Sequence, residues 1–268
     1  MINGIRISMH PAATTPVEKK EWPAGSCKQE NIYNFEYHPR NDGYYPCRIY
    51  GLPEPVYPYT GSCFYYGVSR ERNGVQFDFQ SAEKYYSIEF TPEERCHFYN
   101  SIMEVRTFTE GDIPVGISEA RRYAEERLVD QHSVFAKEDI LAGQCIGIYA
   151  GESVVSGNHT CFRQKDRELY GIELNVRTHR KPVEGTLVGD GTLSRINSIF
   201  AYEQSRGWYE EKSGYNVILA SVPVISEEGE HILWPCCFAL TNIKAGEEMR
   251  VQYGYPDDLV NRMMTRVD

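Results

Sequence analysis

The feature of this sequence that most limits its fold is a change in the pattern of residue types near Asp130. Beyond that residue, short runs rich in β-branched side chains alternate with turns that contain glycine. Runs of this kind, bounded by turn residues, predict short strands. Three of them cover residues 144–149, 216–225 and 231–240, and the last two are expected to form a hairpin across 227–230. The predicted fold class is therefore mainly β with a few helices.

Two helices are expected before that point. Thr91-Pro92-Glu93-Glu94 combines a capping residue, a proline suited to the first helical position and a glutamate that closes a capping box, and it predicts a helix from 91 to about 103. Residues 118–129 are rich in helix formers and in opposite charges at neighbouring positions. That second helix is predicted to be a solvated connector.

The N-terminal part has no apolar periodicity. Residues 1–30 carry scattered prolines and are predicted to be a loose lead-in. Residues 31–117 begin with many aromatics broken by prolines, which favours either a small irregular core packed on the next domain or an interface. The predicted domain boundaries are 1–30, 31–117, the connector 118–130, the β-rich domain 131–258 and a tail 259–268.

Composition and charge restrict the class of protein. Hydrophobic residues make up 41% and charged residues 25% of the 268-residue chain, which are ordinary globular proportions. No run of 18 apolar residues is visible, so neither a membrane span nor a conventional signal peptide is expected. The formal net charge is −10 with the acids spread along the chain, which favours a basic protein partner over nucleic acid.

Cysteine and histidine spacing argues against a metal enzyme. The eight cysteines are irregularly spaced and are expected to be mostly free thiols, and adjacent Cys236 and Cys237 would point to opposite faces of a strand. The seven histidines lack a two-histidine helical spacing, so no metal site is predicted. A cysteine nucleophile paired with His231 is conceivable, but no activating turn is recognisable. His132 is expected in a solvent-facing turn.

Two long stretches mark the ends of the β-rich part. Residues 133–152 read SVFAKEDILAGQCIGIYAGE, a strand, a turn at Ala142-Gly143, a second strand and a second glycine turn at Gly151. Residues 238–255 read FALTNIKAGEEMRVQYGY. The first resembles the opening, and the second the closing motif, of the SET-domain family of protein-lysine methyltransferases. Either stretch alone would suit an ordinary β-hairpin, whereas their order over about 125 residues is specific.

Weaker pieces of the same pattern lie between the two stretches. Residues 170–174 are similar to the family's middle aromatic strand, residues 194–198 to its arginine-to-asparagine-serine signature, and Asn216 to its second asparagine. The sequence departs from the family at Gln131 and Ser133, where a glycine-x-glycine is usual. It also lacks the usual histidine after Asn197, carries Gln252 before the closing tyrosine and has no flanking zinc-binding cysteine cluster. The resemblance is therefore to a divergent, compact member, such as a bacterial effector.

The resemblance implies a SET-like fold of short sheets with a threaded C-terminal segment, and S-adenosylmethionine as cofactor. It implies that Tyr253 is the catalytic residue, orienting the amine or the methyl group. The residues implied to bind the cofactor are Ser133, Phe135, Ala136, Arg195 and Asn197. The residues implied to line the lysine channel are Tyr149, Tyr170 and Tyr255. Each tyrosine could instead be core packing, Asn197 could staple the fold, and Arg195 could pair with an acid.

The implied activity is transfer of methyl from S-adenosylmethionine to a lysine of a basic protein, with histones favoured. The transfer is an in-line displacement that needs a neutral amine, and an aromatic-walled channel beside a cationic cofactor favours loss of the lysine proton. Acids in the C-terminal part, among them Glu210 and Glu248, would attract a basic peptide or simply give a solvated surface. The alternative is a degenerate SET-like interaction module that no longer binds cofactor. The expected location is cytoplasmic or nuclear, in a host cell if the protein is an effector.

Overall fold

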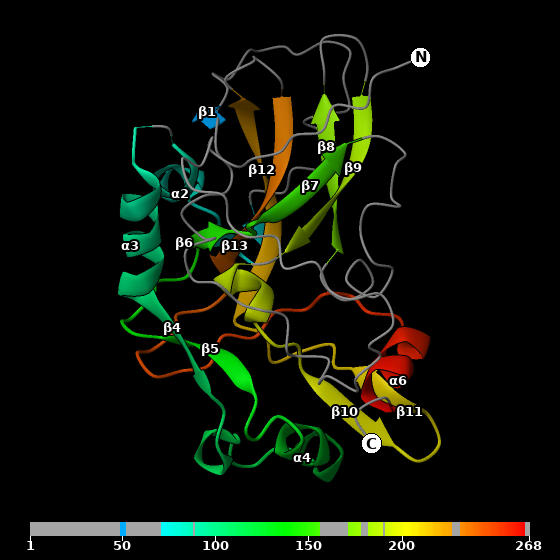
Figure 1. Ribbon diagram of the computed structural model, residues 1–268. Coiled ribbons are helices and arrows are strands. Elements are labelled where there is room, and N and C mark those ends of the chain that lie inside the picture. The colour runs from blue at the N-terminus through cyan, green and yellow to red at the C-terminus, as the bar shows by residue number, and fades with distance from the viewer. Residues whose placement is uncertain are drawn as a thin grey trace, which may run out of the picture.

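The computed structural model describes residues 49–51, 71–87, 89–155, 171–177, 182–189, 191–226 and 231–265. Within these ranges the protein is built from short antiparallel sheets with a few short helices, as predicted (Figure 1). Figure 1 shows the large sheet in the upper half of the molecule, with β4, β5, α4, β10, β11 and α6 in the lower half. No helix in this part of the chain has the length and apolar character needed to cross a membrane.

The large sheet runs in the order β1-β12-β13-β8-β9-β7, and β6 pairs with β13 outside that path. Its strands are β1 (Ile49–Gly51), β6 (Cys145–Ile148), β7 (Gly151–Val155), β8 (Gly171–Arg177), β9 (Pro182–Gly189), β12 (Val217–Ser226) and β13 (His231–Ala239). The central pair is the predicted hairpin: β12 and β13 are antiparallel, from Val217 opposite Ala239 to Ile225 opposite His231. The predicted second glycine turn is wrong, because Gly151 is the first residue of β7 and pairs with Gly189.

Three two-stranded sheets complete the β structure. They are β2 (Glu71–Arg72) with β3 (Val75–Gln76), β4 (Met103–Thr107) with β5 (His132–Ala136), and β10 (Phe200–Glu203) with β11 (Gly207–Glu210). The pairing of β4 with β5 crosses the predicted boundary at residue 131, so the region before that residue contributes directly to the β-rich part. The boundary itself remains a prediction.

The helices are short, and the two predicted helices begin where their sequence signals place them. They are η1 (Phe79–Ala82), α2 (Glu83–Tyr86), α3 (Pro92–Ile102), η2 (Glu110–Asp112), α4 (Glu119–Glu126), η4 (Thr192–Arg195) and α6 (Asp257–Thr265). The predicted capping box at α3 is confirmed: Thr91 Oγ1 accepts from Glu94 N, and the Glu94 carboxylate accepts from Thr91 N at 2.7 Å. Helix α6 packs on β11 through Asn261, whose amide oxygen accepts from Trp208 N at 2.8 Å.

Helix α4 differs from the solvated connector that its charges predict. Its Ser118 cap is as expected, since the hydroxyl accepts from Arg121 N. Glu125, however, is 1% exposed and lies inside the protein. A buried carboxylate needs compensating partners, which Arg121 and Arg250 provide. The helix therefore ties the interior of the molecule to its C-terminal segment.

The main core lies between the large sheet and helices α2 and α3. Tyr99 of α3 is fully buried, and its hydroxyl bonds to both the carbonyl and the N–H of Ile148, at 3.2 and 3.1 Å. Gly147 leaves room for that ring, since a Cβ there would lie 2.4 Å from it. Gly143, at the predicted turn, has φ +86, and a Cβ there would meet Gln76 O at 2.2 Å. Only glycine suits that turn and that close approach.

Candidate active site

The closing segment, residues 240–256, lies between parts of the chain that are far apart in sequence. On one side Met249 N donates to Val134 O of β5 at 2.8 Å. On another, Val251 N donates to Asn197 O at 3.2 Å and Val217 N donates to Arg250 O at 3.0 Å. These two hydrogen bonds belong to parallel β-bridges, which pair Asn197 with Arg250 and Val217 with Val251. The segment is thus enclosed by three other segments, which agrees with the predicted threaded C-terminal segment.

Asn216 fixes the same segment through its side chain. Its amide nitrogen donates to Glu248 O and its amide oxygen accepts from Arg250 N, each at 2.8 Å. The two bonds reproduce those of a neighbouring strand, so the asparagine acts as a clip on the closing segment. The residue that the sequence pattern singled out as a second asparagine therefore has a structural role here.

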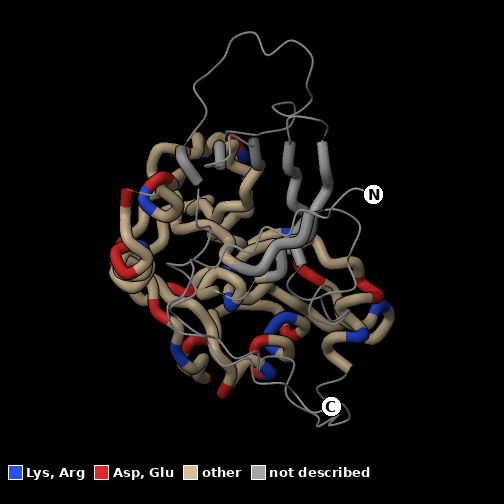
Figure 2. Tube along the Cα trace, turned by 45° about the horizontal axis from the view of Figure 1, so that its top comes forward, with Lys and Arg blue, Asp and Glu red and all other residues tan. Residues whose placement is uncertain are grey.

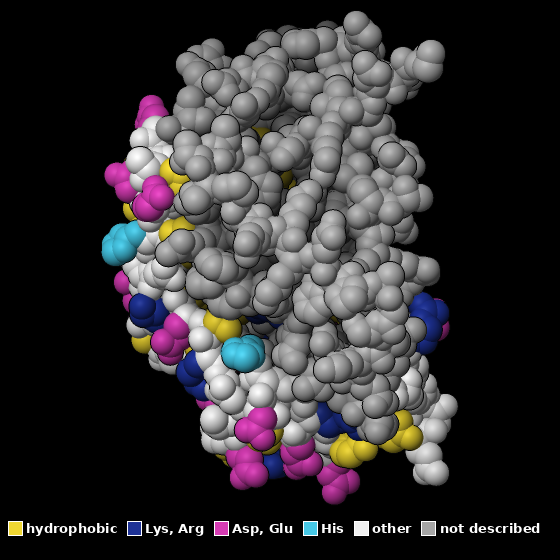
Figure 3. All heavy atoms as spheres, viewed as in Figure 1, with side chains coloured by type: hydrophobic (Ala, Val, Ile, Leu, Met, Phe, Trp, Pro, Cys, Tyr) yellow, Lys and Arg dark blue, Asp and Glu magenta, His cyan; other side chains and the backbone are white. Residues whose placement is uncertain are grey.

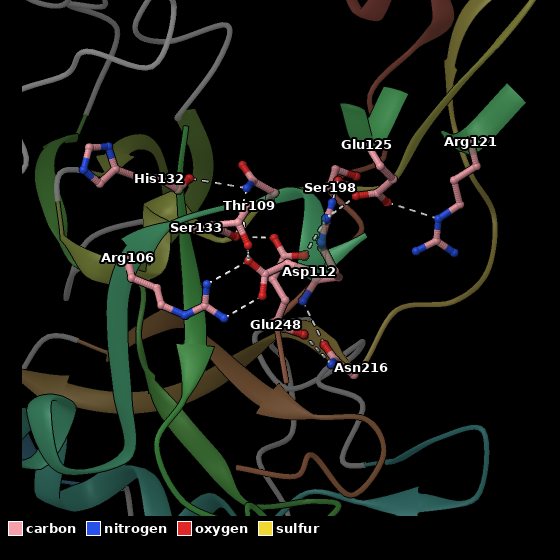
Figure 4. Close-up of polar contacts among 12 residues, drawn as sticks. Arg106, Thr109, Asp112, Arg121, Glu125, His132, Ser133, Ser198, Asn216 and Glu248 are labelled. Carbon is pink, nitrogen blue, oxygen red and sulfur yellow. Dashed lines mark hydrogen bonds and ion pairs between the residues drawn. The ribbon is translucent and has the colours of Figure 1, made fainter. Parts of the chain in front are cut away.

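Ser133 and Glu248 lie together in Figure 4, and Asn197 bonds to Ser133, so the opening, middle and closing motifs converge here. The Ser133 hydroxyl donates to Glu248 Oε1, and Asn197 Nδ2 donates to Ser133 Oγ at 3.0 Å. Asn197 Nδ2 also lies 3.4 Å from His132 O. The Asn197 side chain is half-buried, and among the described residues no donor reaches its Oδ1. That oxygen is an acceptor available to a ligand.

Arg250 holds the carboxylates of this region together. Its guanidinium is buried and lies 2.5 Å from both Glu125 and Glu248, while Nη1 donates to Ser198 O at 2.8 Å. Burial raises the pKa of Glu248 above its ordinary value, although Arg250 and the Ser133 hydroxyl oppose that shift. The carboxylates of Glu125 and Glu248 raise the pKa of Arg250, against the effect of its burial. The cluster is thus a buried ion network that joins α4 to the closing segment.

Tyr253 and Tyr255 form a stacked pair beside these residues. Their ring centroids are 5.2 Å apart with planes 27° apart, and both side chains are half-buried. The Tyr253 hydroxyl donates to Ile196 O at 3.0 Å, one residue before Asn197. Tyr255 also stacks on Phe200, with centroids 6.4 Å apart. Two predicted site tyrosines therefore lie together, next to a predicted cofactor residue.

The other predicted cofactor residues, Phe135, Ala136 and Arg195, are buried. Phe135 is 1% exposed, and the Arg106 guanidinium carbon lies 3.3 Å from its ring centroid. Ala136 is 2% exposed, and its N–H donates to Glu247 O at 2.9 Å. Arg195 is 8% exposed at the end of η4. The roles of these residues in cofactor binding remain predictions.

Of the two remaining channel tyrosines, the structure describes Tyr149. Tyr149 is 1% exposed, and a Cβ on Gly189 would lie 2.4 Å from its ring, so this ring packs against the strand backbone. The carbonyl of Tyr149 accepts from Trp234 Nε1 at 3.2 Å. Tyr170 lies outside the described residues. The roles of both as channel residues remain predictions.

Two charged residues that hold the site together, Glu125 and Arg250, were not singled out by the sequence, and Glu210 was expected only as a surface acid. Arg250 sits between apolar Met249 and Val251, where alternation would place it toward solvent. All three residues of that stretch are buried because the closing segment is enclosed on several sides. One sequence signal could have indicated the burial of Arg250: a charged residue within a segment that is predicted to be threaded.

Two of the described cysteines lie in an environment that disfavours a reactive thiolate. Cys145, Cys236 and Cys237 are not disulfide-bonded, and burial raises the pKa of both Cys236 and Cys237. A thiol in such an environment is a poor nucleophile. Across the described ranges no cluster of three or more histidine, cysteine or acidic side chains is arranged to hold a metal ion.

Comparison with known proteins gives limited likenesses. No family model matches the sequence, and no curated protein matches it significantly. Among solved structures, the methyltransferase domain of human PR domain-containing protein 2 is 14% identical, with a TM-score of 0.29, over 56% of this chain and 90% of that one. The Neurospora SET-domain protein DIM-5, a histone lysine methyltransferase, is 15% identical, with a TM-score of 0.35, over 78% and 82% of the two chains. At these values the function has to be inferred from the residues of this chain.

Proposed function

We propose that this protein transfers a methyl group from S-adenosylmethionine to a lysine of a basic protein. The observation that carries the proposal is the convergence of the three motifs: Asn197 bonds to Ser133, and the Tyr253 hydroxyl bonds to the carbonyl beside Asn197. Ser133 and Asn197 are 64 positions apart in the sequence, and Ile196 and Tyr253 are 57 positions apart. The fold thus brings both pairs to one place. The convergence supports a shared site for a cofactor and a reacting amine.

The donors and acceptors at that place suit the cofactor. Asn197 Oδ1 can accept from an amino group, while the adjacent rings of Tyr253 and Tyr255 present aromatic faces that attract a cation. S-adenosylmethionine supplies an electrophilic methyl group on a cationic sulfur. The part of this chain is to hold the lysine amine in line and to favour its neutral form by removing it from water. The hydrogen bond from the Tyr253 hydroxyl to Ile196 O supports a role for this residue in orienting that amine.

An acidic surface supports binding of a basic partner, but this surface is formed by other residues than the acids named from the sequence. Glu210 is 7% exposed and the Glu248 side chain 10%, and both bind groups of the protein, so neither attracts a peptide at the surface. Figure 2 shows acidic and basic residues interspersed along much of the described trace. In Figure 3, acidic side chains gather over η2 and α4, where Glu110, Glu119 and Glu126 are exposed. We favour this surface for capture of a lysine-rich tail such as that of a histone.

The second candidate is an interaction module without cofactor, and Ser133 favours it. This side chain occupies a position where the resemblance expects glycine, and its hydroxyl engages the Asn197 amide. A site filled in this way leaves less room for close approach of a ligand. The two candidates predict opposite results in a direct binding experiment.

The test is calorimetric titration of the whole protein with S-adenosylmethionine, beside Asn197→Ala and the matched control Asn242→Ala. Asn242 is an exposed asparagine in the same closing motif whose amide oxygen accepts from Ala142 N at 2.9 Å, so this variant removes an amide that is not bonded to Ser133. The expected result is saturable binding that is weakened at least about tenfold by Asn197→Ala and unchanged by Asn242→Ala. No binding by a folded wild-type chain would favour the interaction module.

Catalysis is tested with labelled cofactor and a histone mixture. Tyr253→Phe removes only a hydroxyl and is expected to lower kcat at least about tenfold, because a misplaced amine loses alignment. Tyr202→Phe is the control, since Tyr202 is exposed and lies outside the three motifs. Equal rates for wild type and Tyr253→Phe would remove Tyr253 from the mechanism.

A further inference from the structure

Glu210, at the end of β11, is a buried carboxylate that binds two predicted site residues through their backbone. It is 7% exposed. Its Oε1 accepts from Tyr253 N at 2.9 Å, and its Oε2 accepts from Tyr255 N at 2.8 Å. The Ser198 hydroxyl also donates to Oε1. In the described part of the chain Glu210 forms no ion pair, so these hydrogen bonds are what compensates its burial.

These contacts join the two sides of the proposed site. Ser198 directly follows Asn197, and the Tyr253 hydroxyl returns to Ile196 O at 3.0 Å. The segments around residues 197 and 254 are therefore connected at two points, by the Glu210 carboxylate and by the tyrosine hydroxyl. A ring held both at its backbone N–H and at its hydroxyl has little freedom to turn.

We propose that Glu210 is a positioning residue for methyl transfer, acting by fixing the backbone of Tyr253 and Tyr255. The inference rests on the proposed function and deepens it. Glu210 itself does not reach the reacting atoms through any contact seen here; its effect passes through the two tyrosines. Its position in the β10–β11 hairpin makes that hairpin part of the catalytic apparatus.

The chemistry of the carboxylate explains why glutamate is needed. Two backbone N–H groups meet two different oxygens, and a glutamine has only one acceptor oxygen. In Glu210→Gln the amide NH₂ would face one of the two N–H groups, so one tyrosine would lose its anchor. The side-chain volume stays almost the same, which limits other damage to packing.

The experiment compares wild type, Glu210→Gln and Glu203→Gln in steady-state methylation of histone peptide. Glu203 lies on the same hairpin, is exposed and accepts from the Tyr209 hydroxyl at 2.7 Å, so it is the matched control. For Glu210→Gln, kcat is expected to fall about tenfold while the KM for S-adenosylmethionine changes less than about twofold. Glu203→Gln is expected to match wild type. A general loss of folded protein would also lower the apparent kcat without changing KM, so the rates are divided by the concentration of folded enzyme, measured by circular dichroism and by titration with S-adenosylmethionine.

A second readout does not depend on activity. Hydrogen exchange of the amides of Tyr253 and Tyr255 is expected to be slow in wild type and in Glu203→Gln and faster in Glu210→Gln. If Glu210→Gln does not fold, Glu210→Asp keeps the charge but shortens the reach, and the same fall in kcat is expected. Unchanged kcat in a folded Glu210 variant, with an active wild type, would overturn the inference alone. A wild type that neither binds cofactor nor methylates would overturn the proposed function and the inference with it.

Discussion

The side-chain amide of Asn197 donates a 3.0 Å hydrogen bond to the hydroxyl oxygen of Ser133, which lies 64 residues earlier in the chain. That hydroxyl donates in turn to the carboxylate of Glu248. Ser133 thus uses its donor on one neighbour and its acceptor on another. The position and orientation of the Asn197 amide are therefore set by a residue that replaces an expected glycine.

Ser133→Ala should destabilise the protein by about 1–2 kcal/mol, because two hydrogen bonds of a buried hydroxyl are lost and Glu248 loses a donor. Urea unfolding at neutral pH measures the change. The control is Ser101→Ala, which removes an exposed hydroxyl bound only to Phe98 O and should cost much less. Equal stability of the two variants would show that the Ser133 contacts contribute no net free energy.

Arg250→Ala should be far more damaging, at about 3–5 kcal/mol, because it leaves Glu125 and Glu248 buried without their shared cation. Arg206→Ala removes an arginine from an exposed pair with Asp257 and should cost much less, because solvent and salt screen that pair. Both free energies of unfolding come from the same denaturant titration. Similar costs for the two arginines would contradict a buried ion network.

The Arg250 variant should also respond to pH in a particular direction. Burial raises the pKa of Glu248, so protonation of this group is favoured by folding and its contribution declines as pH rises above about 4.5. Removing Arg250 removes the main opposing effect and raises that pKa further. The stability deficit of Arg250→Ala relative to wild type should therefore shrink as pH falls from 7 toward 5. A deficit that grows over this interval would be inconsistent with the proposed electrostatics.

Asp112 should give the opposite pH dependence. The hydrogen bonds from Arg106, at 2.7 and 2.8 Å, lower the pKa of this carboxyl well below its ordinary value of 3.8. A lowered folded pKa gives stability that is present above pH 4 and is lost as pH falls further. Asp112→Asn should cost on the order of 1 kcal/mol at pH 7, since Arg106 is 36% exposed and partly screened. Unfolding curves at pH 7, pH 4 and pH 2 should show that this cost declines only below pH 4 and is still partly present at pH 3, because the folded pKa lies well below 3.8.

Local signals in the sequence predicted individual elements well. The capping box at Thr91, the β12–β13 hairpin and the turn at Gly143 depend on residues close together in the chain, and all three are present. The second glycine turn failed because Gly151 enters a strand whose partner is β9, and that pairing is set by tertiary contacts. Local propensity holds no information about such a partner.

Long-range features could be predicted only through the motifs. The meeting of Ser133, Asn197 and Tyr253 was expected from the order of the motifs, yet nothing local to Glu125 or Glu210 indicates burial. Each lies in a stretch that reads as an ordinary polar surface, and each is buried because a donor arrives from a distant segment: Arg250 in one case, the Tyr253 and Tyr255 backbone in the other. Partners 43 to 125 residues away leave no trace in the local pattern.

Asn216 offers a direct test of how the closing segment is held in place. Its two 2.8 Å bonds go to Glu248 O and Arg250 N, which flank Met249 in the enclosed segment. Asn216→Ala should destabilise the protein by about 2–4 kcal/mol, because two backbone groups that are shielded from water lose their partners. Asn216→Asp should recover only part of that loss: its carboxylate still accepts from Arg250 N but cannot donate to Glu248 O. Thermal and urea unfolding of both variants should rank wild type above Asp and Asp above Ala, and an aspartate variant no more stable than alanine would mean that the Arg250 N contact contributes nothing.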